Sequence, residues 1–322
     1  MRALQTGFIY ICLMSRPKVS VSLITFNHEK YLVACLDSIV KQLVNFDLEI
    51  VVSDDCSTDK TPEIVAFYAS KYPELIKPIY RKQNLGMVKN ALDTIKQCRG
   101  DYIAILEGDD FWPDEHKLQA QADYLDLNTD CVICYTNGYI FYEDEPLRKD
   151  FFFTSAQKPP EKLDLDFYIW YHPIIPNNTK MFRKTAHPEI FPLWIYDAIN
   201  WDWILHVLQL INGKAGYIDA ITLAYRRHPG AAFNAQSEEK ILFSGIATAV
   251  AMNKYLNFRY NDSLKNLWWE NRELALIYLQ KRSIFKFLAY YSWFIFSVPR
   301  TEKMKAKDEL WRIKTALLGR KS

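Results

Sequence analysis

The stretch Tyr102-Ile103-Ala104-Ile105-Leu106-Glu107-Gly108-Asp109-Asp110 places three carboxylates directly after an apolar run. The run has the length and composition of a buried strand, and Gly108 marks a turn. Like charges this close repel one another and raise each other's pKa unless a cation or water screens them. Carboxylate oxygens suit Mg²⁺ or Mn²⁺, which proteins hold with one or two carboxylates plus substrate phosphates. The cluster therefore indicates either a divalent metal site or a solvated acidic turn.

The composition is that of a globular protein. The 322 residues are 49% hydrophobic and 24% charged, which suits one large domain or two modest ones. Because the formal net charge is only +2, nothing global indicates nucleic-acid binding. Aromatic residues make up 15% of the chain, which fits sugar-stacking surfaces, a membrane-facing surface or an aromatic core.

Six cysteines are scattered without a disulfide framework and predict reduced thiols in a cytoplasmic protein. Cys131-Val132-Ile133-Cys134 has the spacing of a metal or redox pair. The run has strand character, however, and residues three apart on a strand point to opposite faces. No second pair is present in the sequence, so we assign both thiols to core packing.

Strand and helix patterns alternate along the first third of the chain. Predicted strands cover residues 19–25, 48–53, 76–80 and 102–106, and predicted helices cover residues 31–42, a segment starting at 61, and 88–98. Such alternation implies a mainly parallel sheet with helices on both faces. Ligands of such sheets bind beyond the carboxyl ends of the strands, where the polar turns lie here. The sequence has no Gly-rich dinucleotide fingerprint or Walker loop, which leaves a metal as the natural partner for a pyrophosphate.

Several stretches occur in an order that is typical of one enzyme family. They cover residues 18–27, 49–61, 81–86 with 100–103, 107–112, 200–203 and 225–228. On these motifs, residues 18–235 resemble a family 2 glycosyltransferase. The resemblance implies an α/β fold of the GT-A type, with a Rossmann-like, mainly parallel central sheet flanked by helices and a C-terminal helical extension.

The resemblance also implies a nucleotide site. Phe26, next to Asn27, would lie against the base of the donor nucleotide. Asp55, with Asp54 beside it, would accept a hydrogen bond from the base imide, which favours uracil or thymine.

The metal site follows from the same resemblance. Asp109 would ligate a Mn²⁺ or Mg²⁺ ion that bridges the diphosphate, and Asp110 would support it. Glu107 stands where the commoner family pattern has Asp, as the other acid of the D-x-D motif.

Asp202 is the candidate catalytic base of an inverting transfer, in which a carboxylate deprotonates the acceptor hydroxyl. Trp201 and Trp203 would line the acceptor groove. The alternative is a helix N-cap, because Asp before an apolar run is good capping chemistry.

Beyond the predicted strand 217–224, Arg227 and His228 are candidates to clamp the diphosphate from a mobile loop. Asn177-Asn178-Thr179 matches a glycosylation acceptor but is more simply a polar loop.

These features predict a metal-dependent inverting glycosyltransferase that moves a sugar from a nucleotide diphosphate donor, UDP or dTDP being favoured, to a glycan or lipid-linked acceptor in polysaccharide or cell-surface glycan synthesis. Two alternatives stay open. One is a non-catalytic, membrane-associated scaffold that keeps the fold. The other is a sugar nucleotidyltransferase, although its Gly-rich opening loop is missing between Val19 and Lys41.

Three segments are expected. Residues 1–17 form an extension, with Met14 as the natural start; residues 18–235 form the GT-A domain, its nucleotide half about 18–112 and its acceptor half about 113–235; residues 236–322 form a helical region. Within that region, the apolar segment 284–298 contains Lys286 and is short of a bilayer span. Residues 300–321 form a basic tail after it. With this tail, the segment suits a helix on the inner membrane surface of a cytoplasmic protein, or a helix packed on the catalytic domain or in a homodimer seam.

Overall fold

The computed structural model describes residues 16–145, 147–171, 175–228, 230 and 237–260. The proposed start at Met14, the apolar segment 284–298 and the basic tail lie outside the described residues. Of the expected helical region 236–322, the structure describes α7 (Glu238–Tyr255) and the residues just after it. Among the described helices, none is long and apolar enough to cross a membrane.

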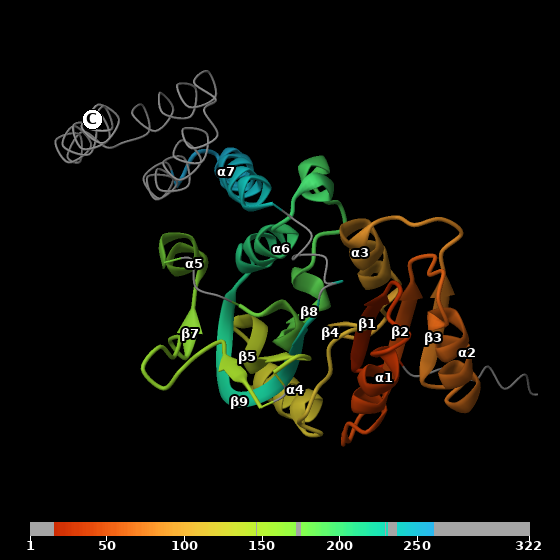
Figure 1. Ribbon diagram of the computed structural model, residues 1–322. Helices are drawn as coiled ribbons and strands as arrows, with labels where there is room; N and C mark the ends of the chain where they lie inside the picture. Colours follow the sequence, from red (N-terminus) through yellow and green to blue (C-terminus); the bar gives the residue numbers. More distant parts are fainter. Residues whose placement is uncertain (1–15, 146, 172–174, 229, 231–236, 261–322) are drawn as a thin grey trace, which may run out of the picture.

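One nine-stranded sheet organises the described part of the chain (Figure 1). Its strands are β1 (Val19–Thr25), β2 (Leu48–Asp54), β3 (Ile76–Tyr80), β4 (Tyr102–Glu107), β5 (Cys131–Tyr142), β6 (Lys149–Phe151), β7 (Lys162–Leu163), β8 (Met181–Arg183) and β9 (Lys214–Arg227). Their order is β3-β2-β1-β4-β8-β5-β9-β7, and β6 pairs with β5. Strands β1 to β4 are parallel, β8 runs antiparallel between β4 and β5, and β9 is parallel to β5. The predicted mainly parallel sheet is confirmed.

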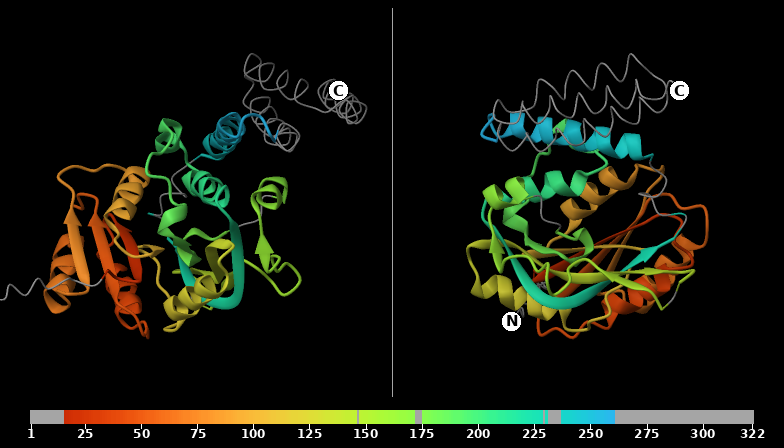
Figure 2. Two further views of the ribbon diagram at one scale, coloured as in Figure 1. Left: turned by 180° about the vertical axis from the view of Figure 1, so that it is seen from behind. Right: turned by 60° about the vertical axis from the view of Figure 1, so that its left-hand side comes forward.

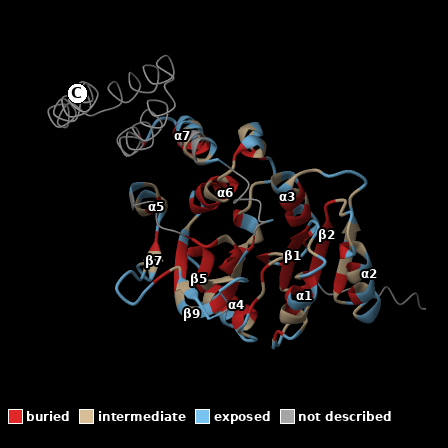
Figure 3. Ribbon diagram, viewed as in Figure 1, coloured by how far each residue is buried: buried red, intermediate tan, exposed pale blue. Residues whose placement is uncertain are grey.

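Helices cover both faces of this sheet, as the two views of Figure 2 show. They are α1 (Leu32–Val40), α2 (Thr61–Lys71), α3 (Met87–Gln97), α4 (Lys117–Leu127), α5 (Leu165–Tyr171), α6 (Trp201–Leu210) and α7, with three 3-10 turns, η1 (Asn177–Thr179), η2 (Lys184–Ala186) and η3 (Leu193–Asp197). One hydrophobic core lies between the sheet and α1, α2 and α4. A second core lies on the other face, beneath α3, α5 and α6. The sheet is accordingly buried while the outer faces of the helices are exposed (Figure 3).

Strand β1 shows how the sequence specifies this layered arrangement. All seven of its residues are buried. Val19, Val21 and Leu23 alternate onto the face that packs against α1. A strand that is buried on both faces belongs in the middle of a helix-covered sheet, and β1 lies there between β2 and β4.

The order of the strands also locates the ligand edge. The chain passes from β1 outward through β2 to β3 and then returns to the other side of β1 as β4. Such a reversal leaves a crevice at the carboxyl ends of the two central strands, where ligands of α/β sheets bind. The turn after β1 and the acidic cluster after β4 therefore meet at this switch point.

The two thiols of the Cys131 and Cys134 pair are fully buried and free, so their assignment to core packing is confirmed. The prediction that they point to opposite faces is wrong. Both belong to the core beneath α4, whereas Ile133 belongs to the other core. The physical reason is a bulge, because the register of β5 with β9 shifts between Cys131 and Ile133.

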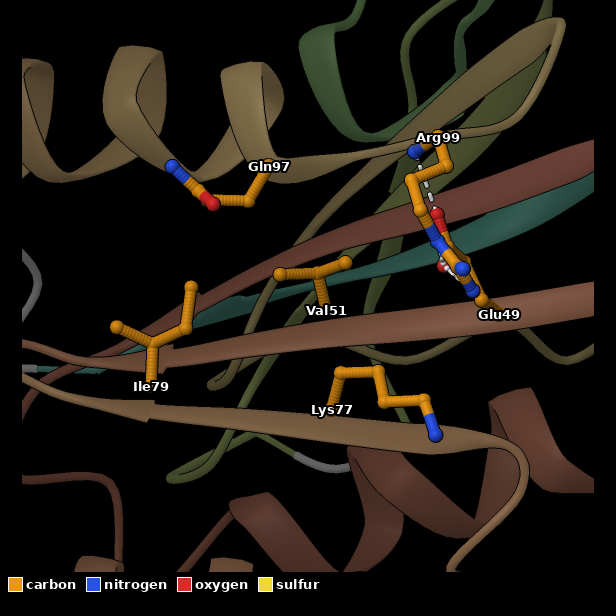
Figure 4. Close-up of a pocket in the computed structure, with 6 residues that line it drawn as sticks. All are labelled: Glu49, Val51, Lys77, Ile79, Gln97 and Arg99. Atoms are coloured by element: carbon orange, nitrogen blue, oxygen red, sulfur yellow. Dashed lines mark hydrogen bonds and ion pairs between the residues drawn. The ribbon is translucent and has the colours of Figure 1, made fainter.

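A pocket of about 380 Å³ opens beside β2 and β3 (Figure 4). It is lined by Glu49, Val51, Lys77, Ile79, Gln97 and Arg99. Because Glu49 and Lys77 lie near the amino-terminal ends of their strands, the pocket is remote from the carboxyl edge that carries the acidic cluster.

Glu49 joins the rim of this pocket to the sheet. Its carboxylate accepts hydrogen bonds from the hydroxyl of Ser20 at 2.6 Å and from Nε of Arg99 at 2.8 Å. The backbone N–H of Arg99 donates to the same carboxylate. Burial alone would raise the pKa of Glu49, but these hydrogen bonds outweigh burial and lower it.

We expect Glu49→Gln to lower the free energy of unfolding by about 1–3 kcal/mol, because the new amide group leaves buried donors without an acceptor. Urea denaturation at neutral pH measures this loss. Glu74→Gln, at an exposed position before β3, is the control and should change stability by less than about 0.5 kcal/mol.

The contribution of Glu49 to the stability of the fold depends on pH. A carboxyl group whose pKa is lower in the folded state than in the unfolded state stabilises the fold when it is ionised. This stabilisation is complete at pH values above the pKa of the unfolded state, and it is lost as the pH falls through the pKa of the folded state. The difference in the free energy of unfolding between the wild type and Glu49→Gln should therefore become smaller as the pH is lowered. A difference that stays constant down to the pH of acid unfolding would contradict the role of the ionised carboxylate.

Candidate functional site

Backbone hydrogen bonds hold the turns after β1, β2 and β4 together. The N–H of Gly108 donates to the carbonyl of Ile24 at 2.9 Å, and the N–H of Asp55 donates to the carbonyl of Thr25 at 3.0 Å. Asn27 adds a side-chain link, since its amide oxygen accepts the N–H of Thr58 at 2.8 Å. The structure thus brings the polar turns predicted from the sequence to one edge of the sheet.

Gly108 permits this close approach. A Cβ at this position would lie 2.7 Å from Oγ1 of Thr25 and 2.9 Å from Nδ1 of His28. These distances are too short for a side chain, so the acidic turn packs against the turn after β1 only with glycine here.

Asp109 lies between two histidines. Its Oδ2 is 3.2 Å from Nε2 of His228 and 3.8 Å from Nε2 of His28. Burial alone would raise the pKa of Asp109, but the hydrogen bond with His228 and the charge of His28 outweigh burial and lower it. Its other oxygen, Oδ1, is buried and has no hydrogen-bond partner among the described residues. His228 was predicted at the site, whereas the contribution of His28 was missed.

The other two carboxylates of the cluster are shifted in the opposite direction. Burial raises the pKa of Glu107 to about 8, and the charges of Asp109 and Asp202 add to the rise. Burial also raises the pKa of Asp110 well above its ordinary value, with contributions from Asp109 and Glu107. The mutual repulsion expected from the sequence is therefore present in the fold.

Asp110 is held by two groups from distant parts of the chain. Nδ2 of Asn178 donates to its Oδ2 at 2.6 Å, and the backbone N–H of Arg226 donates to its Oδ1 at 2.8 Å. Asn178 and Thr179 are buried in η1, so the predicted polar loop is packed beneath the acidic cluster. Neither contact was predicted, because an asparagine in a polar loop carries no signal of its distant partner.

The prediction of a mobile loop starting at Tyr225 is wrong for its first residues, because β9 continues to Arg227. Arg226 faces the site. Its Nε donates to the carbonyl of Asp109 at 2.9 Å, and its guanidinium lies 4.6 Å from the ring centroids of Tyr31 and Phe141. Arg227 is exposed, as alternation along a strand requires. Of the two arginines, Arg226 therefore contacts the acidic turn, whereas Arg227 had been chosen as the candidate.

Asp202 is the second residue of α6, and Asn200 occupies the N-cap position, so the alternative reading of Asp202 as N-cap is wrong. Burial raises the pKa of Asp202, while the charge of Lys180 and backbone N–H groups oppose the rise. The charge of Asp202 contributes to the raised pKa of Glu107. Trp203 is partly exposed, but Trp201 is only 3% exposed and packs in the core, a place that does not suit contact with an acceptor.

The predicted base-binding residues lie around the turns after β1 and β2. Phe26 is exposed. Asp55 is buried and accepts the N–H groups of Leu85 at 2.8 Å and Gly86 at 3.0 Å, so it fixes the turn before α3. Asp54 is also buried, and its Oδ1 has no hydrogen-bond partner among the described residues.

The acidic cluster could contribute one or two carboxylates to a divalent cation. A buried, unpartnered carboxylate oxygen on Asp109 and two neighbouring acids with raised pKa values form a donor set of the kind that hard cations prefer. Within the described ranges, no three His, Cys, Asp or Glu side chains form a group that could hold a metal ion. A site with too few protein ligands for a metal ion is expected where the phosphates of the substrate complete the coordination of that ion.

Comparison with known proteins supports this fold and shows the family. The chain matches the family model described as Glycosyl transferase family 2 over residues 20–191, and it belongs to that family. The predicted GT-A fold class is confirmed by a solved structure, that of residues 1–349 of TarS from S. aureus in complex with UDP-GlcNAc. The two superpose with a TM-score of 0.60 and 19% identity over 88% of this chain and 82% of that 1–349 chain.

Two further relatives are similar in sequence. An uncharacterized protein of Mycobacterium tuberculosis is 32% identical over 210 residues, or 65% of this chain and 59% of that protein. An uncharacterized glycosyltransferase of Nostoc sp. is 25% identical over 289 residues, or 80% of this chain and 86% of its own length. The match thus spans about three fifths of the mycobacterial relative and most of the cyanobacterial one.

Arg226 and Arg227 form a matched pair for testing how the acidic turn is held. We expect Arg226→Ala to lower the free energy of unfolding by about 1–3 kcal/mol, because a hydrogen bond and two aromatic contacts are lost. Arg227→Ala should change it by less than about 0.5 kcal/mol. Chemical denaturation of both variants measures the difference, and equal losses would show that Arg226 does not support the turn.

Proposed function

We propose that the protein is a metal-dependent inverting glycosyltransferase that transfers a sugar from a nucleotide diphosphate donor to a glycan or lipid-linked acceptor. The observation that carries the proposal is the group of three carboxylates, Glu107, Asp109 and Asp110, at the carboxyl end of β4, where Oδ1 of Asp109 is buried and has no hydrogen-bond partner among the described residues. A metal-binding carboxylate and a basic carboxylate are the two groups that such a reaction requires. Membership of the glycosyltransferase family supports it.

The donor nucleotide would bind at the switch point. Phe26 is exposed there to lie against the base, and Asn27, Asp54 and Asp55 form the adjoining turns. We assign the base imide to Asp55, with Asp54 beside it, which favours a UDP- or dTDP-sugar. Both oxygens of Asp55 already accept backbone N–H groups, whereas Oδ1 of Asp54 is buried and has no hydrogen-bond partner among the described residues. TarS, which was solved with UDP-GlcNAc, supports a uridine nucleotide.

Asp109 and Glu107 would hold a Mn²⁺ or Mg²⁺ ion, with Asp110 supporting them from below. When bound, the ion supplies positive charge against the departing diphosphate. We assign His228, which already contacts Asp109, to the phosphates. Arg227 is exposed, and we assign its predicted role to Arg226, which contacts the acidic turn.

Asp202 would act as the general base. It takes the proton of the acceptor hydroxyl while the hydroxyl oxygen bonds to the anomeric carbon, and the bond to the diphosphate breaks on the opposite face. The configuration at that carbon inverts, and the nucleoside diphosphate leaves. Since burial raises the pKa of Asp202, this carboxylate is a stronger base than one in water.

The proposal extends to the setting of the reaction. A cytoplasmic enzyme of polysaccharide or cell-surface glycan synthesis would meet a lipid-linked acceptor at the inner face of the membrane. Trp203, partly exposed beside Asp202, is the residue we assign to acceptor contact. Contact with the membrane and a homodimer seam were predicted from residues that lie outside the described ranges.

Nucleotide binding can be tested by thermal shift with UDP, dTDP, GDP and CDP, each with Mn²⁺, Mg²⁺ or EDTA. We expect UDP or dTDP to stabilise the wild type only with metal, by about 2.7 kcal/mol when the nucleotide is 100-fold above its Kd. Asp109→Asn should abolish this stabilisation, and Glu74→Gln should keep it. Absence of any nucleotide effect would favour the non-catalytic scaffold, and pyrophosphate release from a nucleoside triphosphate would indicate a nucleotidyltransferase.

The role of Asp202 is tested by turnover. Asp202→Asn should lower kcat about 10²–10⁴-fold, because the general base is lost, while the metal-dependent thermal shift with UDP or dTDP persists. Asp197→Asn, at an exposed position in η3, should turn over like the wild type. The measurement is the release of nucleoside diphosphate from the donor in the presence of acceptor. Full activity of the Asp202→Asn variant would exclude Asp202 as the base.

A further inference from the structure

Four aromatic side chains form a row that starts at the acidic turn. Phe111 directly follows Asp110, and its ring centroid lies 5.7 Å from that of Phe141. The centroid of Phe141 is 6.3 Å from that of Tyr139, which in turn is 6.2 Å from that of Phe151. We call these four side chains the aromatic row: Phe111, Phe141, Tyr139 and Phe151.

The pairing of the strands explains why these rings lie side by side. Tyr139 and Phe141 are two residues apart on β5, so their side chains project from the same face of the sheet. The antiparallel pairing of β5 with β6 places Phe151 directly opposite Tyr139. Phe111 joins the row through an isolated bridge with Ala224 of β9, the strand beside β5 (Figure 1). The backbone therefore fixes the order of the rings.

The aromatic row is open to solvent. Phe111, Tyr139 and Phe141 are partly exposed, and Phe151 at the outer end is 46% exposed. A single exposed aromatic ring is common on protein surfaces and needs no explanation. A run of such rings that reaches a candidate site marks a binding surface.

Charged groups lie among the rings. The guanidinium of Arg226 is 4.6 Å from the ring centroid of Phe141, and Nζ of Lys149 is 4.4 Å from that of Tyr139. Nη1 of Arg226 is also 3.5 Å from Oε1 of Glu143. The surface thus offers apolar ring surface and charged hydrogen-bonding groups close together.

This combination fits a carbohydrate better than a lipid. A sugar ring presents C–H groups that pack on the electron-rich face of an aromatic ring, and hydroxyl groups that hydrogen-bond to charged side chains. An acyl chain would instead leave the ammonium, guanidinium and carboxylate groups without water or partners, which is unfavourable.

The aromatic row is continuous with the candidate site. Arg226, which contacts the ring of Phe141, also donates from Nε to the carbonyl of Asp109 at 2.9 Å. A chain molecule that lies along the row would therefore direct one of its ends at the acidic cluster.

We propose that the aromatic row binds the saccharide part of the acceptor, so that a glycan chain lies along β5 and β6 with one end at the acidic cluster. The acceptor role rests on the proposed glycosyltransferase function. The enzyme would accordingly act on an acceptor that already carries several sugar units.

Affinity electrophoresis tests the aromatic row without the donor. The protein is run in native gels that contain hydroxyethyl cellulose, glycol chitin, mannan or dextran, and the Kd follows from the retardation at increasing polysaccharide concentration. We expect at least one of these polysaccharides to retard the wild type. Phe151→Ala should raise that Kd about 5- to 10-fold, because one stacking contact is lost, whereas Phe151→Tyr keeps the ring and should bind like the wild type. Retardation by none of the polysaccharides would overturn the proposal.

Phe151→Leu distinguishes a carbohydrate from a lipid. Leucine keeps an apolar side chain but has no aromatic face, so this variant should bind polysaccharide as weakly as Phe151→Ala. The companion measurement is co-sedimentation with vesicles of phosphatidylglycerol and phosphatidylcholine. Vesicle binding that Phe151→Ala removes and Phe151→Leu retains would assign the row to a lipid surface and overturn the proposal.

Phe67→Ala is the matched control. Phe67 is 63% exposed on α2, and its ring contacts that of Tyr68 edge-on, as the ring of Phe151 contacts that of Tyr139. Helix α2 packs on β3, at the far end of the sheet from β5. We expect the Kd for polysaccharide to stay that of the wild type. An equal loss of binding in Phe67→Ala and Phe151→Ala would show that any exposed ring causes retardation, and it would overturn the proposal.

Nucleotide binding separates this inference from the proposed function. The metal-dependent thermal shift with UDP or dTDP should be the same in Phe151→Ala as in the wild type. A wild type that shows the shift but no retardation would overturn the role of the aromatic row and leave the donor site intact. Retardation without any thermal shift would instead overturn the glycosyltransferase proposal, and the acceptor role of the row with it.

Discussion

The structure depends on how three adjacent carboxylates at the end of β4 coexist. The fold accommodates each of the three carboxylates in a different way. Asp110 is buried and hydrogen-bonded by Asn178 and the backbone of Arg226, and Asp109 is paired with His228. Burial and the charges of its neighbours raise the pKa of Glu107 to about 8. The partners come from η1 and β9, more than 60 residues away along the chain, so the acidic turn fixes the packing of the second half of the fold.

The first half of the fold was readable from the sequence because its contacts are local. Each strand is followed by the helix that covers it, so the spacing of apolar residues and the turn residues predict both elements. The strand predicted at residues 76–80, for example, is found as Ile76–Tyr80. The second half departs from this pattern. Strand β8 has three residues and enters the sheet antiparallel between β4 and β5, a place that depends on pairing with residues far away. No period within three residues can encode such a pairing. The bulge at Ile133 is similar, since only the register with β9 reveals it.

The site was predictable for its acids and not for their partners. Asp109, Asp110 and Asp202 stand out because carboxylates after strands or at helix starts carry recognisable chemistry. Arg226 and Asn178 look like ordinary polar residues until the fold brings them against Asp110. The predicted strand ended at residue 224, so both arginines were placed in a loop, whereas β9 runs to Arg227. On a strand, the phase of the alternation decides which residue faces the site, and the sequence alone did not reveal that phase.

Burial alone does not describe the environment of a lysine. Lys117 and Lys180 are both fully buried, and burial lowers the pKa of each to about 7. The side-chain nitrogen of Lys117 is hydrogen-bonded to a carbonyl and an amide oxygen, and it lies over the ring of Trp112 at 4.4 Å. That of Lys180 has no hydrogen-bond partner among the described residues. Because an unpaired buried charge is costly, the two lysines differ in how their burial is compensated, although their exposed fractions are the same.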